Sequence, residues 1–353
     1  MKEQIQRNFK DFHDKIRIKD LDREEESNKI LREKRDILLK DIKTYFDKKN
    51  KDLDTQEQIK YEWFNQGSYA MYTGVKPLDD SDFDIDVAIV LDINKENYSN
   101  PTTVKKWIFE ALDTKINRTV LWKKPCITVQ YTKAGEEKYH VDFAIYAGNN
   151  DDNKYYLAKG KETSISDEKK WDESSPKELK DSINNRFEGS EEKKQFKRVI
   201  KYLKRWKEEN FKSENSGTGK PTGIALTALI YKHFTPFVKD HFTNTPEVND
   251  LSALLNSVSH IINSNIWSEI EIHLPVPPYN NLFSEMTSIQ MEKFKEKLTT
   301  LKNKLEEAQE NIDPHEASKL IQKVLGSDFP IIEKEKISVR SSMPAMTSSG
   351  ESA

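Results

Sequence analysis

The chain has 353 residues, of which 33% are charged and 35% hydrophobic, and its formal net charge is −3. This length allows two lobes around a shared cleft, and the net charge argues against a protein that binds nucleic acid over its whole surface. The only cysteine, Cys126, lies in an apolar segment, which excludes internal disulfides and cysteine-ligated zinc. No apolar run approaches the ~20 residues of a membrane span, and the N-terminus lacks the apolar region of a signal peptide. We therefore expect a cytoplasmic protein without a membrane anchor.

The order of patterns along the chain predicts an α+β fold with four parts. Residues 1–60 carry apolar side chains at helical spacing and predict N-terminal helices, of which the second is a long scaffold helix that links two lobes. Residues 61–190 predict a catalytic lobe with a mixed sheet, and residues 191–335 predict a helical lobe. Residues 336–353 are rich in Ser and small residues without an apolar period, which predicts a disordered tail.

The segment 66–91 is the most informative part of the chain. Gly67 and Ser68 form a predicted turn, whose backbone N–H groups and hydroxyl are suited to polyphosphate. Further along, Asp84 and Asp86 alternate with apolar residues at the start of a strand, so both carboxylates point to one face. Two carboxylates ~4 Å apart repel by about 4 kcal/mol at an effective dielectric of ~20. We therefore expect a divalent cation between them.

The alternative interpretation of this segment is a solvated acidic loop that runs into an edge strand. The five residues after Asp86, VAIVL, are apolar on both faces of the predicted strand. Such a run is typical of a buried central strand, whereas an edge strand would alternate. The pattern therefore favours a central strand that presents its two acids to a site.

A third acid follows about fifty residues later. Cys126–Tyr131 predicts one strand, a turn around Gly135 follows, and Lys138–Tyr146 predicts the returning strand, with Asp142 in its middle. A lone acid among β-branched and aromatic residues is costly unless it is paired or bound to metal. We expect Asp142 to complete a metal site and to favour deprotonation of an attacking hydroxyl. His140 shares its face and is interpreted as a ladder or rim residue.

The segment Glu191–Asn210 predicts a basic helix with a buried apolar stripe. Lys201 and Lys204 lie closest to that stripe and are expected to reach a cleft, where they would neutralise a triphosphate as point charges. A solvated charged face is the alternative. Thr222 lies at the start of the next helix, where a hydroxyl is suited to an anion, although helix capping explains the residue equally well.

These motifs together resemble the bacterial cGAS/DncV-like nucleotidyltransferases (CD-NTases), which belong to the DNA polymerase β-like superfamily. The resemblance covers most of residues 50–330 and implies a polymerase β-like catalytic lobe. It is carried by Gly67-Ser68, Phe83 to Asp86, Asp142, Trp171 with Ser174-Ser175-Pro176, the KYLKRWK run, Pro221-Thr222-Gly223 and residues 274–283. Gly223 stands where relatives often place an aromatic residue that stacks on a base, so no base preference follows from the resemblance.

The resemblance implies an enzyme that joins NTPs, ATP among them, into a cyclic di- or trinucleotide second messenger for bacterial anti-phage (CBASS) signalling through a downstream effector. It implies two Mg²⁺ or Mn²⁺ ions held by three catalytic acids, Asp84, Asp86 and Asp142. It also implies nucleotide binding by Gly67, Ser68, Lys201, Lys204 and Thr222, with no requirement for nucleic acid. Linear oligonucleotide synthesis, as in 2-5A synthetases, and transfer to tRNA, a protein or an antibiotic stay open. A catalytically silent scaffold is disfavoured, because all three acids are present.

Relatives of this kind are often encoded with ubiquitin-transfer-like partners that conjugate the synthase through its last residue. The tail of this chain ends in the small or polar residues Gly-Glu-Ser-Ala. Such an end is suited to a narrow adenylation site, and we hypothesise that Ala353 is an attachment point for a partner of this class.

Overall fold

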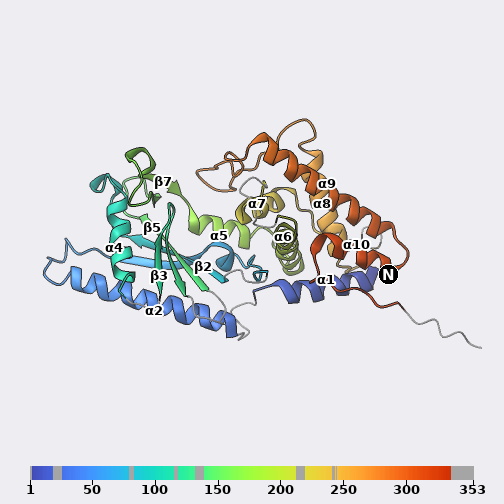
Figure 1. Cartoon of the computed structure of the whole chain (residues 1–353), viewed down its shortest axis with the longest axis horizontal. Coiled ribbons are helices and arrows are strands. Elements are labelled where there is room, and N and C mark those ends of the chain that lie inside the picture. The colour runs from blue at the N-terminus through green and yellow to red at the C-terminus, as the bar shows by residue number, and fades with distance from the viewer. Residues whose placement is uncertain are drawn as a thin grey trace, which may run out of the picture.

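A mixed sheet and a bundle of helices lie next to each other along the long axis of the molecule (Figure 1). The computed structural model describes residues 2–18, 26–78, 83–114, 118–131, 139–211, 219–240, 243 and 245–334, with the backbone alone for residues 26–28 and 83. The predicted α+β fold class is confirmed. The predicted turn after Tyr131 and the predicted tail over residues 336–353 lie outside the described residues.

The described strands form one sheet, in which a parallel pair lies at the centre. The main path runs in the order β1-β2-β5-β4-β3, while β6 pairs with β5 and β7. β2 and β5 are parallel, and the other pairs are antiparallel. β2 is therefore the central strand that its apolar run predicts. The bounds are β1 Tyr61–Gln66, β2 Phe83–Leu91, β3 Thr119–Trp122, β4 Ile127–Tyr131, β5 Tyr139–Ala147, β6 Tyr155–Lys159 and β7 Lys170–Ser174.

One face of the sheet is covered by α2 (Glu26–Lys49) and α4 (Thr102–Leu112), whose apolar side chains share a core with the strands. Ile85 and Val87 of β2 are fully buried in this core. Because side chains alternate along a strand, Asp84 and Asp86 point to the opposite face. The covered face of the sheet thus determines which way the acids point.

The helical lobe is built around α6 (Ser190–Asn210), which contacts α1, α7, α8 and α10. Its apolar stripe is buried as predicted, with Phe196, Val199, Ile200, Leu203 and Trp206 in one core cluster. The other helices of the lobe are α5 Pro176–Asn184, α7 Gly223–His233, α8 Asp250–Asn263, α9 Ser288–Glu310 and α10 Pro314–Leu325. Within the described part of the chain, no helix is both long enough and apolar enough to cross a bilayer.

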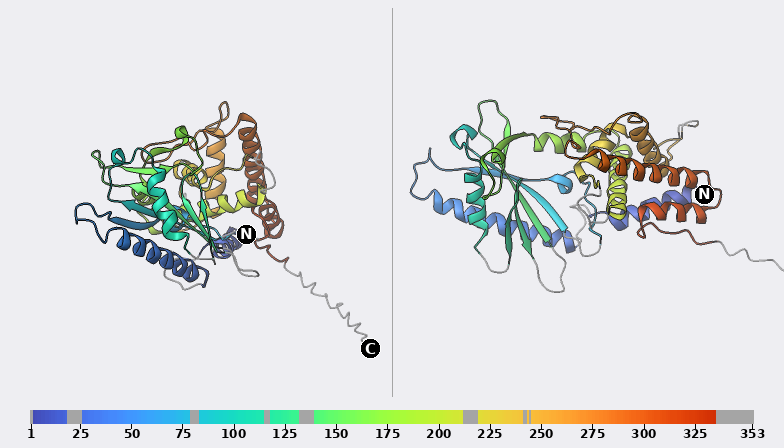
Figure 2. Two further views of the ribbon diagram at one scale, coloured as in Figure 1. Left: turned by 60° about the vertical axis from the view of Figure 1, so that its left-hand side comes forward. Right: turned by 45° about the horizontal axis from the view of Figure 1, so that its top comes forward.

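The N-terminal link between the lobes is made by two helices together. α1 (Lys2–Ile16) packs into the core of the helical lobe, whereas α2 packs against the sheet. Both run along the same side of the molecule, α2 under the sheet and α1 under the bundle (Figures 1 and 2). The predicted part boundaries at residues 60, 190 and 335 stay predictions.

A buried polar network joins α6 to the start of α8. The carboxylate of Asp250 is fully buried and accepts hydrogen bonds from Arg198 Nε at 2.7 Å and Nη2 at 2.9 Å. Tyr202 Oη donates to the same carboxylate at 2.9 Å, and Gln195 Nε2 donates at 3.0 Å. A charge in this position is stable only because every partner is in place.

We expect Asp250→Ala to lower the free energy of unfolding by about 3–5 kcal/mol, because it leaves the Arg198 guanidinium buried without its counter-charge. Urea unfolding followed by circular dichroism measures the loss. Glu191→Ala is the control, because the Glu191–Lys194 ion pair on the same helix is exposed and should contribute less than about 1 kcal/mol. Equal losses in the two variants would contradict the role given to this network.

Candidate active site

The three predicted acids meet on one face of the parallel strand pair. In the register between β2 and β5, Asp86 lies opposite Asp142 and Asp84 lies opposite His140. Each acid offers a carboxylate oxygen, and these oxygens lie within 4.8 Å of one another. The sequence placed Asp84 and Asp86 on one face, and the parallel register adds Asp142 to it.

The hydrogen bonding of Asp142 leaves one of its two carboxylate oxygens without a donor among the described residues. Oδ1 is buried and accepts no hydrogen bond from the described residues. Oδ2 lies 3.7 Å from Lys123 Nζ and accepts a bond from the Cys126 thiol at 3.6 Å. A buried carboxylate oxygen without a donor is costly unless a cation satisfies it. The three carboxylates therefore fit a divalent metal site, because hard cations prefer oxygen ligands.

The electrostatics of the three carboxylates also favour a bound cation. Burial raises the pKa of Asp86 well above its ordinary value, and the charges of Asp84 and Asp142 raise it further. For Asp84, loss of water in the cleft and the charge of Asp142 raise the pKa to about 7. The thiol of Cys126 stays protonated, because burial and the nearby Asp142 raise its pKa to about 12. Without a cation, the cluster resists carrying its full negative charge.

The Gly67-Ser68 turn is held against Asp86 by the absence of a side chain at residue 67. Gly67 begins the short helix α3 (Gly67–Ala70) with a left-handed backbone, φ +64°. A Cβ added there would lie 1.9 Å from Asp86 Oδ2. Only glycine permits this approach without displacing the carboxylate, so the turn and the acids form one site.

A cavity of about 410 Å³ opens between the two lobes at this point. Asp84, Asp86 and the Gly67-Ser68 turn line it from the catalytic lobe, with Asp142 beside them. The helical lobe contributes a mainly apolar wall, made by Leu179, Gly223, Ile224, Thr227, Leu274, Val276 and Pro277. The volume and the mixture of charged and apolar walls are typical of a small-molecule site.

Lys204 reaches this cavity from α6, as the sequence predicts. Its ammonium is buried and donates to Thr73 O at 3.0 Å and to Thr73 Oγ1 at 3.1 Å. The pKa of Lys204 is lowered to about 7, mainly by burial and also by the charges of Lys207 and Lys201, while Asp86 opposes them. The Lys204 amine therefore shares the cavity with the acids, while its printed hydrogen bonds go to the neutral oxygens of Thr73.

Two other predicted residues lie elsewhere. Lys201 Nζ lies 3.2 Å from His13 Nε2 and lines a separate cavity. Thr222 is the N-cap of α7, where its hydroxyl accepts a bond from Ala225 N–H at 3.2 Å, and it lines a third cavity without the acids. Of the two interpretations of Thr222, the structure shows the capping. His140 is bonded to Gln130 at 2.8 Å across β4 and β5, which is the ladder position expected.

The cavity also contains residues that sequence reasoning did not assign. Tyr146 is buried at the cavity wall and donates to Gln66 Oε1 at 3.0 Å. Lys180 and Thr227 line the wall formed by the helical lobe. None of these residues belongs to a local motif. An aromatic residue in a strand or a lysine on a helix is equally common inside and outside a functional site, so the sequence gives no signal. By contrast, Trp171 of the resembling motif donates to Tyr98 O at 2.8 Å and is not among the lining residues.

Comparisons with known proteins agree with this geometry. Residues 61–146 match the family described as "Cyclic GMP-AMP synthase DncV-like, nucleotidyltransferase domain". A cyclic GMP-AMP synthase of Escherichia albertii is 27% identical over 217 residues, which are 58% of this chain and 45% of that protein. The chain thus spans less than half the length of this curated relative.

Solved structures extend the match over nearly the whole fold. Vibrio cholerae DncV cyclic AMP-GMP synthase has a TM-score of 0.68 at 17% identity, over 92% of this chain and 97% of that one. E. coli MS115-1 CdnC with ATP has a TM-score of 0.63 at 16% identity, over 92% and 98%. Together with the family match over residues 61–146, the site defines a nucleotidyltransferase domain. Residues 61–146 match a DncV-like nucleotidyltransferase domain, and the predicted resemblance to the cGAS/DncV-like nucleotidyltransferases is confirmed.

We expect metal-free protein to lose stability relative to Asp86→Asn as the pH rises from about 5 to about 7. The folded pKa of Asp86 lies above its unfolded value of ~3.9, so the folded state holds more protons in this range and stability falls with pH. The asparagine variant cannot lose that proton, and the difference in Tm should grow by a few degrees. Scanning fluorimetry in EDTA measures it, and Mg²⁺ or Mn²⁺ should raise the wild-type Tm only. A difference that stays constant with pH would contradict the predicted repulsion.

Proposed function

We propose that this chain is a metal-dependent nucleotidyltransferase that joins NTPs into a cyclic di- or trinucleotide. The observation that carries the proposal is the cluster Asp84, Asp86 and Asp142, which faces a cavity shared with the Gly67-Ser68 turn and Lys204. Structures of V. cholerae DncV with a linear pppA(3′,5′)pG intermediate, and of a DncV mutant with ATP and GTP, support the same substrate class by similarity of fold.

In this proposal the three carboxylates hold divalent cations, two Mg²⁺ or Mn²⁺ ions. Bound cations supply positive charge at the α-phosphate and make a ribose hydroxyl easier to deprotonate. The chain's own groups position the reactants: the N–H groups of the Gly67-Ser68 turn bind phosphate oxygens, and Lys204 neutralises the triphosphate. Oδ1 of Asp142, which no described residue bonds, would help hold a cation and so favour deprotonation of the attacking hydroxyl, whose proton passes to solvent as pyrophosphate leaves.

In this proposal Lys204 is the only one of the predicted lysines that binds the triphosphate. Lys201 and Thr222 line other cavities, so their predicted contacts with nucleotide gain no support from the geometry. The apolar wall that includes Leu274 and Val276 is the surface on which a base would pack, in place of the aromatic residue that Gly223 does not supply.

The biological setting is also part of the proposal. We infer a role in bacterial anti-phage signalling through a downstream effector in the cytoplasm, which rests on the resemblance to CD-NTases. E. coli CdnC forms a complex with a HORMA protein, so a protein partner is known for one structural relative. Conjugation through Ala353 stays a prediction about residues outside those described.

The test is incubation of purified protein with the four NTPs and Mg²⁺ or Mn²⁺, followed by mass analysis of the products. We expect a cyclic di- or trinucleotide, and Asp86→Asn should reduce its formation by at least about a thousandfold, since that residue holds the cations. Glu292→Gln, on an exposed face of α9, is the control and should keep wild-type turnover. Linear products alone would favour the 2-5A synthetase-like alternative, and no product without an added acceptor would favour transfer to another molecule. Wild-type turnover in Asp86→Asn would contradict the proposed site.

Lys204→Ala should weaken NTP binding by about tenfold or more, because it removes the cation that reaches the cavity from α6. Lys293→Ala, a change of an exposed lysine on α9, should alter the affinity less than twofold. Both affinities can be measured by calorimetry with a non-hydrolysable NTP and Mg²⁺. Circular dichroism checks that the Lys204 variant is folded, and equal affinities would remove the triphosphate role from Lys204.

A further inference from the structure

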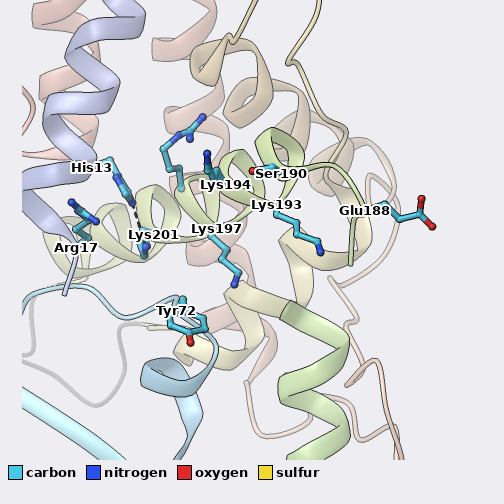
Figure 3. Close-up of a pocket in the computed structure, with 10 residues that line it drawn as sticks. His13, Arg17, Tyr72, Glu188, Ser190, Lys193, Lys194, Lys197 and Lys201 are labelled. Atoms are coloured by element: carbon cyan, nitrogen blue, oxygen red, sulfur yellow. Dashed lines mark hydrogen bonds between the residues drawn. The ribbon is translucent and has the colours of Figure 1, made fainter. Parts of the chain in front are cut away.

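Three lysines are buried among the residues that the structure describes: Lys105, Lys201 and Lys204. The two on α6 line cavities, and Lys201 lies beside His13 in one of them (Figure 3). Lys105 lies instead on α4, is 0% exposed, and shares the buried face of that helix with mainly apolar residues. A lysine at such a position is costly unless its ammonium is fully hydrogen-bonded.

Backbone carbonyls surround the ammonium of Lys105. Its Nζ donates to Lys123 O at 2.7 Å, to Lys124 O at 2.9 Å and to Gly160 O at 2.8 Å. An ammonium has three N–H groups, so each of them has an acceptor. Burial lowers the pKa of Lys105 to about 8, and the group is therefore still mainly charged at neutral pH. Three carbonyl dipoles thus converge on one positive charge.

Two of these carbonyls belong to residues 123–126, which we call the β3–β4 turn because they connect these strands. Lys123 N–H closes the turn by donating to Cys126 O at 3.0 Å. An apolar side chain in place of the Lys105 ammonium would leave buried carbonyl oxygens converging on a group that cannot donate, which is unfavourable. The conformation of the β3–β4 turn therefore depends on Lys105.

The same turn makes two contacts with Asp142. Lys123 Nζ lies 3.7 Å from Asp142 Oδ2, and the thiol of Cys126 donates to this oxygen at 3.6 Å. The other oxygen, Oδ1, accepts no hydrogen bond from the described residues. Because both contacts go to one oxygen, the turn determines how the carboxylate is rotated and which oxygen is left for a cation.

Lys105 acts on the acids through its position and not through its charge. Burial and Asp142 raise the pKa of Asp84, and Lys123 lowers it, but Lys105 is not among the charges that shift it. The described hydrogen bonds of Lys105 go to carbonyls alone. A substitution at this residue therefore reaches the acids only by moving the β3–β4 turn.

We propose that Lys105 is a positioning residue for nucleotidyl transfer, whose ammonium holds the β3–β4 turn so that Lys123 and Cys126 orient the carboxylate of Asp142 toward a divalent cation. The inference rests on the proposed function, because it concerns the metal site described there. Loss of a group that holds a metal ligand in place typically lowers metal affinity by about 10–100-fold.

Cys126 is the only cysteine of the chain, so its reaction with a thiol reagent reports on the β3–β4 turn. In EDTA, Lys105→Met should speed the reaction of Cys126 with DTNB by about tenfold or more, because the turn opens and exposes the buried thiol. Lys106→Met is the matched control on α4, since that side chain is 58% exposed, and should change the rate less than about twofold. Lys105→Gln keeps two N–H donors and covers the case in which Lys105→Met fails to fold. An unchanged rate in both Lys105 variants would overturn the proposal.

Mn²⁺ binding by the full chain without NTP, followed by the EPR signal of free Mn²⁺, tests the consequence for the acids. Lys105→Met should weaken binding by about tenfold or more, whereas Lys106→Met should change it less than about twofold. Asp142→Asn leaves Asp84 and Asp86 as ligands. In that background Lys105→Met should cause no further loss, because it acts through the missing carboxylate.

The outcomes distinguish this inference from the proposed function. Wild-type protein that binds no Mn²⁺, or Asp142→Asn that binds it as tightly as the wild type, would overturn the metal site and this inference with it. Affinity that falls in Asp142→Asn but not in Lys105→Met would overturn the positioning role alone. Equal losses from Lys105→Met with and without the Asp142 carboxylate would reveal a general structural effect and would overturn the positioning role as well.

Discussion

The repulsion among three carboxylates on neighbouring parallel strands is the constraint on which the rest of this site depends. Asp86 and Asp142 are held opposite each other by the β2–β5 register, and Asp84 lies two residues away on the same face. The arrangement is maintained because Ile85, Val87 and Val141 are fully buried under α2 and α4. Burial on one face of the sheet thus keeps the acids together on the other, and a cation is the natural counterpart of their charge.

The two lobes supply different halves of the same cavity. The catalytic lobe contributes the acids and the Gly67-Ser68 turn, whereas the helical lobe contributes an apolar wall and Lys204. Thr73 connects the halves, because it follows the turn and accepts hydrogen bonds from Lys204. The buried apolar stripe of α6 and the Arg198–Asp250 network fix the position of this helix. The position of α6 in turn determines where the Lys204 amine lies relative to the three acids.

Helix α6 also separates two electrostatic environments. Lys204 lines the cavity with the acids, while Lys201, one turn earlier, lies beside His13 and lines a separate cavity. Lysines three residues apart on one helix are neighbours in space, yet the chain around them directs them to separate cavities.

The sequence by itself determined the local parts of this protein. Alternation placed Asp84 and Asp86 on one face, the apolar run after Asp86 predicted a central strand, and the helical stripe of α6 was predicted residue by residue. These features follow from the periods of two and 3.6 residues, which the chain carries locally. The α+β fold class could be predicted for the same reason, whereas the resemblance to DncV-like nucleotidyltransferases rests on short motifs in the sequence.

Only the tertiary structure decided which distant residues share a cavity. Lys201 and Lys204 look equivalent in the sequence, but the packing of α1 places His13 beside one, and the chain after α3 places Thr73 beside the other. The sequence predicts N-terminal helices of which the long second one spans both lobes, whereas in the structure α1 packs on the helical lobe and α2 packs on the sheet. Tyr146 and the apolar wall carry no local signal, because their role arises from side chains that meet across long separations in the chain. Periodicity specifies the face that a residue occupies, whereas the partner of that face is set by the packing of the whole molecule.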